Sequence, residues 1–410
     1  MIDLTELRKN PELFKQQILK KDPSYPIDIL IKSDFDHRQL LLEVEVLRKE
    51  KNEISKSSSG SVSVDVRQRS IQIGKELKEK EATLAVLEKK FNDLYLSCPN
   101  PMHADVPAGN KPENKEVTIF GSKPTFNFTP KDHLTLGNEL RWFDFQAAAK
   151  VTGSNFAWYK GDAVKLLYAL TRMMLQTNIK HGFYPMLAPY LVNTKSLEAC
   201  GQLPKFADGV YKIEGEDLYL IPTSEVSLLN YHRDEILSSE QLPQRFTSWT
   251  SCFRREAGTY GATERGLIRI HQFEKVELVS FTKPEDSYAE LDRMIACGEE
   301  ILQKLGLHYR VMLLAAQDAS FQSAKTYDIE VWMPGQGSFY EVSSASNCTD
   351  FQARRAKIRY KENAGAKSEY VHTLNASSLA LPRLMVALME TYQQSDGSIQ
   401  LPACLVQQGW

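Results

Sequence analysis

The chain has 410 residues, of which 52 are acidic and 50 are Lys or Arg, so its formal net charge at pH 7 is −2. This balance excludes a uniformly basic surface, and any contact with RNA must therefore use local patches. The sequence has no apolar run of the roughly 20 residues needed to span a bilayer and no signal-peptide core, so we expect a cytoplasmic protein with no membrane partner.

The six cysteines lie far apart and form no CxxC pair. This spacing predicts neither a disulfide framework nor a structural zinc site, and we expect buried thiols instead. At this length, and with 42% hydrophobic residues, the chain can form two domains or one large domain with an appendage.

Two ladders of apolar residues between residues 36 and 96 predict a helical hairpin. Their spacing alternates between four and three residues, and residues 57–61 leave room only for a short turn, so the helices should be antiparallel. Helices of about 25 residues would make an arm roughly 35 to 40 Å long. The residues alone favour a dimerisation coiled coil or a plain spacer. The apolar positions are Leu40, Val44, Leu47, Ile54, Ile73, Leu77, Leu84, Leu87, Phe91 and Leu94.

The run Cys98-Pro99-Asn100-Pro101 should end the second helix, because proline cannot continue one. The stretch that follows is rich in Pro, Gly and Asn, as linkers are. We therefore predict an N-terminal domain over residues 1–100, a linker over 101–116 and a second domain over 117–410.

Residues 162–182 have helical periodicity, and the following GFYPMLAPYLV is typical of a strand. Residues 285–305 and 309–314 likewise predict an amphipathic helix and a strand with a structural role. The apolar side of the first helix can face either a core or an interface. It comprises Val164, Leu166, Leu167, Leu170, Met174 and Ile179.

The run Pro222-Thr223-Ser224-Glu225 follows a short apolar segment and precedes a helix predicted from about Val226. Small hydroxyl side chains at such a position commonly cap a helix. Helix capping is therefore the favoured interpretation of these residues by themselves.

Residues 247–281 are dense in charge, and their alternation predicts a long antiparallel hairpin joined by a Gly-bearing loop. Burying the charges in a core would be costly. The hairpin can instead bind phosphate, a base and a small polar substrate, or it can be solvated with cross-strand ion pairs. One face of each strand would carry Cys252, Arg254 and Glu256, and Arg269, His271, Phe273, Lys275 and Glu277, respectively.

Residues 325–331 and 338–344 predict two further strands around a turn. In the second strand, Glu341 and Ser343 should point to one side with Ser344 adjacent. Their hard oxygen atoms would suit Mg²⁺, although a strand glutamate more often simply lies at the surface.

A last helix is predicted after residue 380, with Asn375, Ser377 and Ser378 as possible caps and Pro382 in its first turn. Arg383 would then lie near the helix N-terminus. A positive charge there opposes the helix dipole unless an anion is bound nearby. The inward stripe of this helix is Leu384, Met385, Leu388 and Met389.

Several stretches resemble signature motifs of the class II aminoacyl-tRNA synthetases, in the form found in seryl-tRNA synthetases. They are PTSE, FRREAGTYGATERGLIRIHQFEKVE, EVSSASNCTDFQARR and HTLNASSLALPRLMVALMETYQ. The resemblance implies an α+β fold, in which an antiparallel-sheet class II catalytic domain follows an N-terminal antiparallel two-helix coiled-coil arm. It also implies that the arm grips the long variable arm of tRNA and that residues 162–192 build a homodimer interface.

The activity implied by this resemblance is a two-step ligation. L-serine and ATP form seryl-adenylate, and serine is then esterified to the 3′ end of tRNA(Ser), with tRNA(Sec) as a second acceptor. Little covalent work would fall to the protein, because positioning and charge neutralisation carry such phosphoryl chemistry.

The resemblance also assigns the site residues. Arg254 and Arg383 would hold the α- and γ-phosphates and, with Glu256, form the catalytic set. Glu341 and Ser344 would hold Mg²⁺ through ATP, and Phe273 would stack on adenine. The ATP-binding residues would be Arg254, Arg255, Glu256, Phe273, Glu341, Val342, Ser343, Ser344 and Arg383. The serine-binding residues would be Thr223, Ser224, Glu225, Arg254, Glu277, Asn375 and Ser377.

The chain departs from the usual glycines of this family at Ala376, Ser378 and Pro382, and it has Gln317-Asp318-Ala319-Ser320 in place of a Gly-Asp step. A positive φ at any of these positions would cost of order 1 kcal/mol, so we expect altered affinity but unaltered chemistry. Two alternatives remain. The arm argues against a ligase that charges a non-tRNA carrier, and the retained charges argue against a non-catalytic RNA-binding paralogue.

Overall fold

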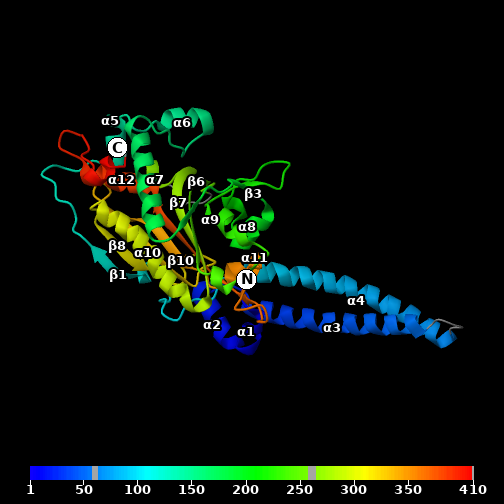
Figure 1. Ribbon diagram of the computed structural model, residues 1–410. Helices are drawn as coiled ribbons and strands as arrows, with labels where there is room; N and C mark the ends of the chain where they lie inside the picture. The colour runs from blue at the N-terminus through cyan, green and yellow to red at the C-terminus, as the bar shows by residue number, and fades with distance from the viewer. Residues whose placement is uncertain (58–62, 257–264, 409–410) are drawn as a thin grey trace. The chain divides into compact units, whose positions relative to one another are not determined.

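The computed structural model describes residues 1–57, 63–256 and 265–408. The chain divides into two compact units, Met1–Pro99 and Asn100–Trp410 (Figure 1). Among the helices that the structure describes, none combines the length and the apolar character that crossing a bilayer demands. The cysteines are free thiols, all of them buried except the half-buried Cys404, which confirms the predicted thiols.

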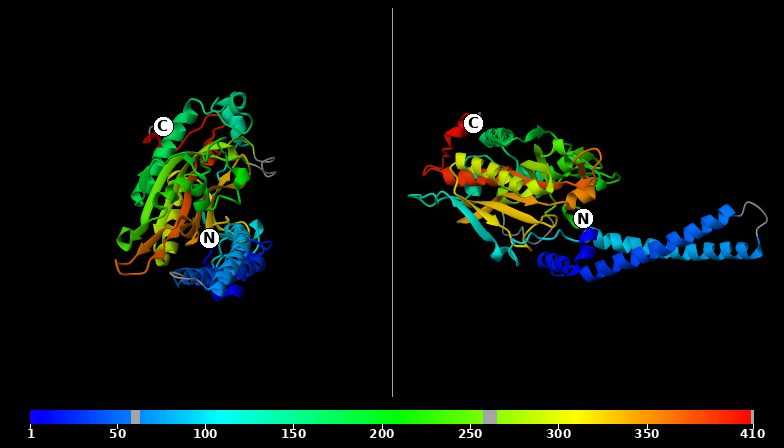
Figure 2. Two further views of the ribbon diagram at one scale, coloured as in Figure 1. Left: turned by 90° about the vertical axis from the view of Figure 1, so that its right-hand side faces the viewer. Right: turned by 60° about the horizontal axis from the view of Figure 1, so that its bottom comes forward.

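The first unit contains α1 (Leu4–Lys9), α2 (Pro11–Lys21) and two long helices, α3 (Ile27–Ser57) and α4 (Val64–Ser97). The two long helices run antiparallel as a hairpin, best seen in the right-hand view of Figure 2. The predicted two-helix arm is therefore confirmed, although α3 begins well before residue 36. The predicted turn, apart from Ser57, lies outside the described residues.

The predicted apolar ladders form the seam between α3 and α4. Val44, Ile73 and Leu77 are buried there, and three partly buried residues pack against them, namely Leu47, Ile54 and Leu84. Exposed ion pairs contribute about 1 kcal/mol or less each, so the apolar seam is the main stabilising contact of the hairpin. The ion pairs across the two helices are Arg48–Glu81, Arg69–Glu50 and Lys80–Glu43.

The second unit is built on a sheet of strand order β1-β8-β9-β10-β13-β7-β6-β2. All neighbours are antiparallel except β2 and β6, which are parallel, so the predicted α+β antiparallel-sheet fold is confirmed. The strands are β1 (Lys115–Phe120), β2 (Tyr184–Met186), β6 (Gln244–Phe253), β7 (Gln272–Thr282), β8 (Tyr309–Leu313), β9 (Lys325–Met333), β10 (Ser338–Asn347) and β13 (His372–Ala380).

Two small sheets and several helices surround this sheet. The small sheets pair β3 (Leu191–Val192) with β4 (Tyr219–Leu220), and β11 (Arg359–Lys361) with both β5 (Ile236–Ser238) and β12 (Glu369–Tyr370). The helices are α5 (His133–Glu139), α6 (Phe145–Thr152), α7 (Asp162–Lys180), α8 (Thr194–Cys200), α9 (Glu225–Leu229), α10 (Ser287–Lys304), α11 (Phe351–Ala356), α12 (Leu381–Tyr392) and α13 (Ala403–Val406).

One face of the large sheet is apolar and covered by helices. α7, α10 and α12 pack against its central strands, as Figure 1 shows. Leu278, Ile329 and Val342 are among the residues buried between the two layers. Because strand side chains alternate between faces, the opposite face of these strands can carry the polar residues.

Three predicted elements differ in the structure. The predicted hairpin is confirmed, but its first strand ends at Phe253 and its second strand begins only at Gln272. The loop residues 257–264 lie outside the described residues. The segment GFYPMLAPYLV forms two short strands, because prolines interrupt it. Ile179 is 47% exposed and does not face the core, since it lies in the last turn of α7.

Candidate active site

The face of the sheet turned away from α7, α10 and α12 is polar. The register places Glu277 opposite Ser248 on β6 and opposite Ser377 on β13, while Ser344 lies opposite Asp328. A ligand on this face can therefore meet side chains from five strands. They are Ser248, Thr250 and Cys252 on β6; Phe273, Lys275 and Glu277 on β7; Asn375 and Ser377 on β13; Glu341, Ser344 and Ser346 on β10; and Thr326, Asp328 and Glu330 on β9.

A cavity of about 330 Å³ opens on this polar face. Of its described lining residues, four are cationic and two are acidic, a balance that suits an anionic ligand. The charged lining residues are Arg254, Glu256, Arg269, Lys275, Glu341 and Arg383. The others are Leu267, Ile268, Ile270, Phe273, Ser377, Ala380 and Pro382.

Arg254 follows β6 directly and lies over the ring of Phe273, with its guanidinium carbon 5.2 Å from the ring centroid. Its Nε donates to the Pro222 carbonyl at 3.2 Å, and its backbone N–H donates to the His271 carbonyl at 2.8 Å. These contacts hold the guanidinium at the cavity wall, although the residue lies beyond the end of the strand.

Glu256 forms an ion pair with Arg269, whose Nε lies 2.6 Å from Glu256 Oε2. The φ of Glu256 is +46°, in the left-handed region that costs a non-glycine residue of order 1 kcal/mol. Backbone strain of this kind is often found at functional sites.

Arg383 lies in the first turn of α12, as predicted, with its side chain 24% exposed. Its Nε donates to the Ile268 carbonyl at 3.1 Å and its Nη1 to the Glu341 carbonyl at 2.8 Å. The Glu341 carboxylate is 3.5 Å away. Because backbone carbonyls take these two hydrogen bonds, the guanidinium charge is only partly compensated and can attract an anion.

The predicted caps of α12 are wrong. Asn375, Ser377 and Ser378 lie in β13, and the residue that precedes the helix is Ala380. The error has a physical cause: polar residues on a buried, ligand-facing strand look in sequence like a cap before a helix. The inward stripe of α12 is confirmed, with Leu384, Met385, Leu388 and Met389 fully buried.

Directly beneath the cavity, Thr223, Lys275 and Glu277 form a buried group. Lys275 Nζ forms an ion pair with Glu277 and donates to Thr223 Oγ1 at 2.9 Å. Thr223 Oγ1 in turn donates to Glu277 Oε2 at 3.2 Å, and it accepts from the Glu225 N–H at 3.2 Å. The Thr223 hydroxyl thus takes part in the site and bonds the first residue of α9, but the N-cap residue is Ser224 and no side chain caps the helix, so the capping interpretation is wrong.

Glu225 adds a second buried carboxylate to this group. Its Oε1 accepts from Gln352 Nε2 at 2.7 Å and from Asn375 Nδ2 at 3.1 Å. When both carboxyls are ionised, Glu225 and Glu277 interact with two cations, the ammonium of Lys275 and the guanidinium of Arg254. If a ligand phosphate takes the charge of Arg254, an ammonium group on the ligand would balance the second carboxylate.

Burial, together with the nearby charge of Glu277, raises the pKa of Glu225 to about 7, although the hydrogen bond from Gln352 lowers it. Burial also raises the pKa of Glu277, while the positive charge of Lys275 lowers it. The unliganded site therefore holds Glu225 partly protonated at neutral pH.

Replacing Glu225 with glutamine should make the stability of the chain less dependent on pH. The pKa of Glu225 is raised from 4.5 to about 7 on folding, so between these values the folded chain holds a proton that the unfolded chain has lost. Stability should fall as pH rises through this window, on the order of 3 kcal/mol in total, and Glu225→Gln removes that component. Urea unfolding of both proteins at pH 5 and pH 8 measures it. If the free energy of unfolding of both proteins changes equally between pH 5 and pH 8, the pKa of Glu225 is not raised on folding.

The structure brings Glu341 and Ser344 together but separates Val342 and Ser343 from them. A register irregularity in β10 inserts an extra residue between Glu341 and Ser343. Glu341 and Ser343 therefore do not point to the same side of the strand, contrary to the prediction. Val342 is buried in the core, and Ser343 Oγ donates to the Ser377 carbonyl.

Two further assigned residues, Arg255 and Ser224, also lie outside the described lining of the cavity, as do Ser344, Asn375 and the buried Thr223, Glu225 and Glu277. Arg255 is exposed, and its backbone N–H donates to the Gly209 carbonyl at 3.0 Å. Ser224 is buried, and its hydroxyl has no hydrogen-bond partner among the described residues. Sequence reasoning gave no role to three residues of the site, although two of them, Lys275 and Arg269, were placed on the predicted strand face of Glu277. The third is Gln352.

The departures from the family's glycines cause no backbone strain. Ala376, Ser378, Pro382 and the Gln317–Ser320 step are not among the described residues with positive φ. Ser378 instead lies at a register irregularity of β13 and its hydroxyl donates to Asn178 Oδ1 at 3.1 Å. Asp318 Oδ2 accepts from Asn114 Nδ2 at 2.8 Å.

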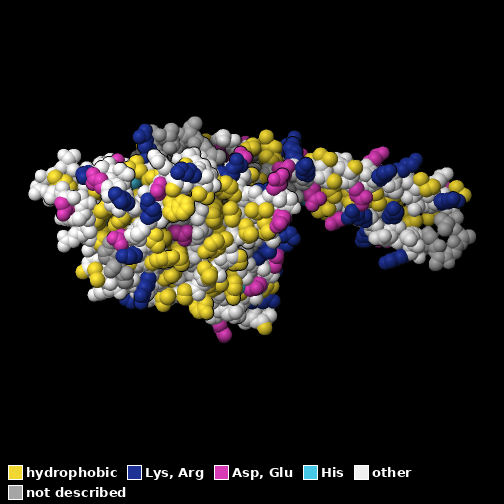
Figure 3. All heavy atoms as spheres, turned by 90° about the horizontal axis from the view of Figure 1, so that it is seen from above, with side chains coloured by type: hydrophobic (Ala, Val, Ile, Leu, Met, Phe, Trp, Pro, Cys, Tyr) yellow, Lys and Arg dark blue, Asp and Glu magenta, His cyan; other side chains and the backbone are white. Residues whose placement is uncertain are grey.

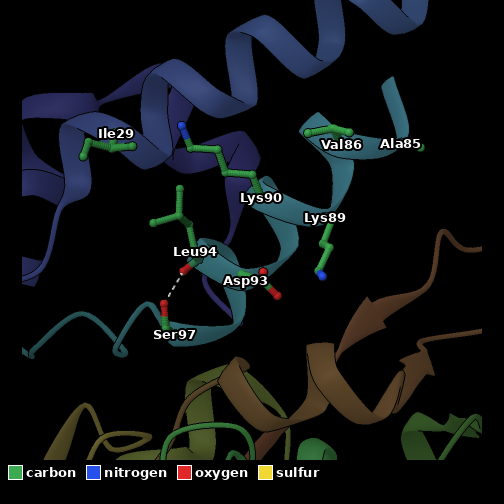
Figure 4. Close-up of a pocket in the computed structure, with 8 residues that line it drawn as sticks. All are labelled: Ile29, Ala85, Val86, Lys89, Lys90, Asp93, Leu94 and Ser97. Carbon is green, nitrogen blue, oxygen red and sulfur yellow. Dashed lines mark hydrogen bonds between the residues drawn. The ribbon is translucent and has the colours of Figure 1, made fainter. Parts of the chain in front are cut away.

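A second, more open hollow lies on α3 and α4 in the first unit (Figure 4). Its lining is mainly apolar with two lysines, and it lacks the converging arginines and carboxylates of the cavity on the sheet. We therefore assign the chemistry to the sheet cavity. The hollow is lined by Ile29, Ala85, Val86, Lys89, Lys90, Asp93, Leu94 and Ser97.

Comparison with known proteins agrees with both units. Residues 210–392 match the family model of the tRNA synthetase class II core domain (G, H, P, S and T), and residues 1–102 match that of the seryl-tRNA synthetase N-terminal domain. The serine–tRNA ligases of Carboxydothermus hydrogenoformans and Desulfotalea psychrophila are 43% and 45% identical over 412 and 420 residues. The alignments cover 99% of this chain and 97% and 98% of those proteins, respectively.

Among solved structures, the seryl-tRNA synthetase of Pyrococcus horikoshii complexed with ATP superposes with a TM-score of 0.93 at 36% identity. The match covers 100% of this chain and 98% of that one. With this identity and coverage, and with the motifs gathered around one cavity, the chain belongs to the seryl-tRNA synthetase family.

Proposed function

We propose that this chain is an ATP-dependent serine–tRNA ligase that forms seryl-adenylate in the cavity on the polar face of the sheet. One observation carries the assignment: Arg254, Arg383 and Lys275 line one cavity, and Lys275 forms an ion pair with the buried carboxylate of Glu277. The arginines suit a triphosphate, and the carboxylate suits an amino acid that brings an ammonium group.

ATP would occupy the outer part of this cavity. Arg254, held by the Pro222 carbonyl, is placed to bind the α-phosphate, and Arg383 is placed to bind the γ-phosphate. Both guanidiniums are fixed before the ligand arrives, so they stabilise the charge that develops on the phosphates with little reorganisation. Phe273 offers an apolar ring for adenine.

Serine would occupy the inner part, above Thr223 and Glu277. Its ammonium group supplies the positive charge that the two buried carboxylates lack once a phosphate takes the charge of Arg254, and its hydroxyl can bond Ser377 or Asn375. Alanine would leave such buried groups unpaired, which is costly, and the carboxylates repel acidic side chains.

Replacing Glu277 with alanine should impair serine activation far more than ATP binding. Glu277 bonds Thr223 and Lys275, and its interaction with the phosphate-binding Arg254 is weaker than that with Lys275. We expect the KM for serine to rise at least tenfold and the preference for serine over alanine and threonine to shrink, because the buried carboxylate supplies the discrimination. Pyrophosphate exchange with the three amino acids measures this, and unchanged selectivity would remove Glu277 from the serine site.

We propose that oxygen atoms around Glu341 hold a divalent cation together with the ATP phosphates, since the described residues contain no group of three or more His, Cys, Asp or Glu side chains that could hold a metal by themselves. Ser344 lies on the same face, and opposite it Asp328 Oδ1 is buried with no hydrogen-bond partner among the described residues. Glu341 and Ser344 would hold Mg²⁺, which when bound to ATP neutralises phosphate charge. Mn²⁺ binding in the presence of ATP, followed by electron paramagnetic resonance, should weaken in Glu341→Gln.

The segment from α7 to β3 supports a homodimer. It exposes large apolar side chains, with Tyr184 68% and Leu187 79% exposed, and Tyr168 and Leu191 are also exposed. Figure 3 shows hydrophobic side chains gathered across one broad face of the second unit. Exposed apolar groups of this kind are typical of interaction surfaces. The sedimentation mass of the purified chain tests the proposal.

We further propose that residues 1–100 form a tRNA-binding domain, joined by residues 101–116 to a catalytic domain over 117–410. The helical arm of the first unit has an evident use in gripping the long variable arm of tRNA(Ser), and tRNA(Sec) is proposed as a second acceptor. We propose the cytoplasm as its location, because ATP and tRNA are available there. Charging of the two tRNA transcripts tests the acceptors, and cell fractionation tests the location.

Pyrophosphate exchange with each of the twenty amino acids, followed by transfer to tRNA, tests the activity as a whole. Serine-dependent exchange with transfer to tRNA(Ser) is the expected result. Exchange without transfer to any tRNA would favour a non-tRNA carrier, and absence of exchange would favour a non-catalytic paralogue.

A further inference from the structure

His133 is buried between α12 and the segment that lines the cavity, and it has no assigned role. It is the first residue of α5 and only 2% exposed. Its Nδ1 lies 3.2 Å from Glu390 Oε1, and its Nε2 lies 3.3 Å from the backbone nitrogen of Leu267. One imidazole therefore joins the last turns of α12 to the wall of the cavity.

The partners of His133 determine which nitrogen carries the proton. The backbone N–H of Leu267 can only donate, so Nε2 must accept, and Nδ1 must donate to Glu390. Glu390 is fully buried and also accepts from the backbone N–H groups of His133 and Gly335 and from Gln336 Nε2, at 2.9 to 3.0 Å. The Leu267 N–H thus requires an Nε2 without a hydrogen atom, and the Glu390 carboxylate accepts the hydrogen atom on Nδ1.

The Leu267 peptide is directly connected to the phosphate-binding end of the cavity. Leu267 and Ile268 both line the cavity, and the Ile268 carbonyl accepts the hydrogen bond from Arg383 Nε. Glu390 follows Arg383 by seven residues, two turns along the same face of α12. α12 therefore holds the Leu267–Ile268 segment at two points, directly through Arg383 and indirectly through His133.

Gly266 shows how closely the imidazole fits. Its φ is +66°, and a Cβ at this position would lie 2.3 Å from His133 Nε2. No other residue type can occupy position 266 without moving the imidazole or the peptide it holds.

We propose that His133 is a positioning residue for ATP: it fixes the Leu267–Ile268 peptide and, through the Ile268 carbonyl, the orientation of Arg383. The inference rests on the proposed function, since it requires ATP to bind in this cavity. His133 touches no reacting atom, so its effect should fall on ATP and spare serine.

Two conservative variants separate positioning from packing. His133→Asn places an amide N–H near the position of Nδ1 and keeps the bond to Glu390, but it loses the acceptor for Leu267. His133→Gln places an amide oxygen near the position of Nε2 and can still accept from Leu267. We expect the KM for ATP in pyrophosphate exchange to rise roughly tenfold in His133→Asn with the KM for serine unchanged, and His133→Gln to recover most of the ATP affinity.

His308→Asn is the matched control, because His308 is also buried and bonds a backbone carbonyl, that of Phe120, at 2.7 Å, but it does not line the cavity. Gly266→Ala adds a Cβ that displaces His133 Nε2 from the Leu267 N–H. It replaces His133→Asn as the test if that variant does not fold. Equal ATP constants in the Asn and Gln variants, or an unchanged KM for ATP in Gly266→Ala, would overturn the inference. Absence of exchange in the wild-type chain would instead reject the proposed function.

Discussion

Replacing Arg383 with alanine is expected to reduce serine-dependent pyrophosphate exchange by roughly 10³-fold or more. An arginine that stabilises the charge developing on the phosphates of a nucleotide has an effect of that size. The chain should still fold, since the side chain is partly exposed and, among the described residues, bonds only the carbonyls of Ile268 and Glu341, besides its contact with the Glu341 carboxylate. Exchange kinetics and thermal unfolding of the same protein provide the measurement.

Two further variants sharpen this test. Arg383→Lys keeps the charge but loses the planar fork, so we expect an intermediate activity. Arg293→Ala is the control, because Arg293 is a half-exposed arginine on α10, on the helix-covered side of the sheet. Wild-type exchange in Arg383→Ala would contradict the γ-phosphate assignment.

Removing the outer part of the arm should abolish tRNA charging and spare adenylate formation. Deleting residues 41–87 and joining the ends by a short glycine-rich turn keeps the base of the hairpin, where His37 stacks on Phe91 and Asp34 pairs with Arg8. All described lining residues of the cavity lie in the second unit, so exchange should remain almost unchanged. Aminoacylation of tRNA(Ser) should fall by at least roughly 100-fold, because phosphate and shape contacts with RNA are lost together.

The two assays distinguish the possible roles of the arm. If the shortened chain charges tRNA as well as the full chain does, the arm is a spacer or a dimerisation element. If exchange is lost as well, the arm supports the fold of the second unit, and the proposed domain boundary is misplaced. Circular dichroism of the shortened chain confirms that α1, α2 and the base of the hairpin remain folded.

The elements that the sequence predicted well are those with a strong local period. The ladders of α3 and α4 and the amphipathic α10 each repeat an apolar position over several turns, so no distant contact is needed to recognise them. The motifs around Arg254, Glu341 and Arg383 identified the family for a similar reason, since the residue types and their spacing lie within single segments.

Only the tertiary structure decided which side chains meet. The sequence around Asn375 and Ser377 predicts helix caps, because a polar run before a helix looks the same in sequence as a ligand-facing strand. Only the pairing of β13 between β7 and β10 distinguishes the two. One extra residue in β10 reversed the side to which Ser343 points. Glu225 and Glu277 share a buried site, and Glu390 reaches Leu267 through His133, although these residues are far apart in the chain. Local periodicity determines helices and strands, whereas register and burial, which depend on the whole sheet, determine the site.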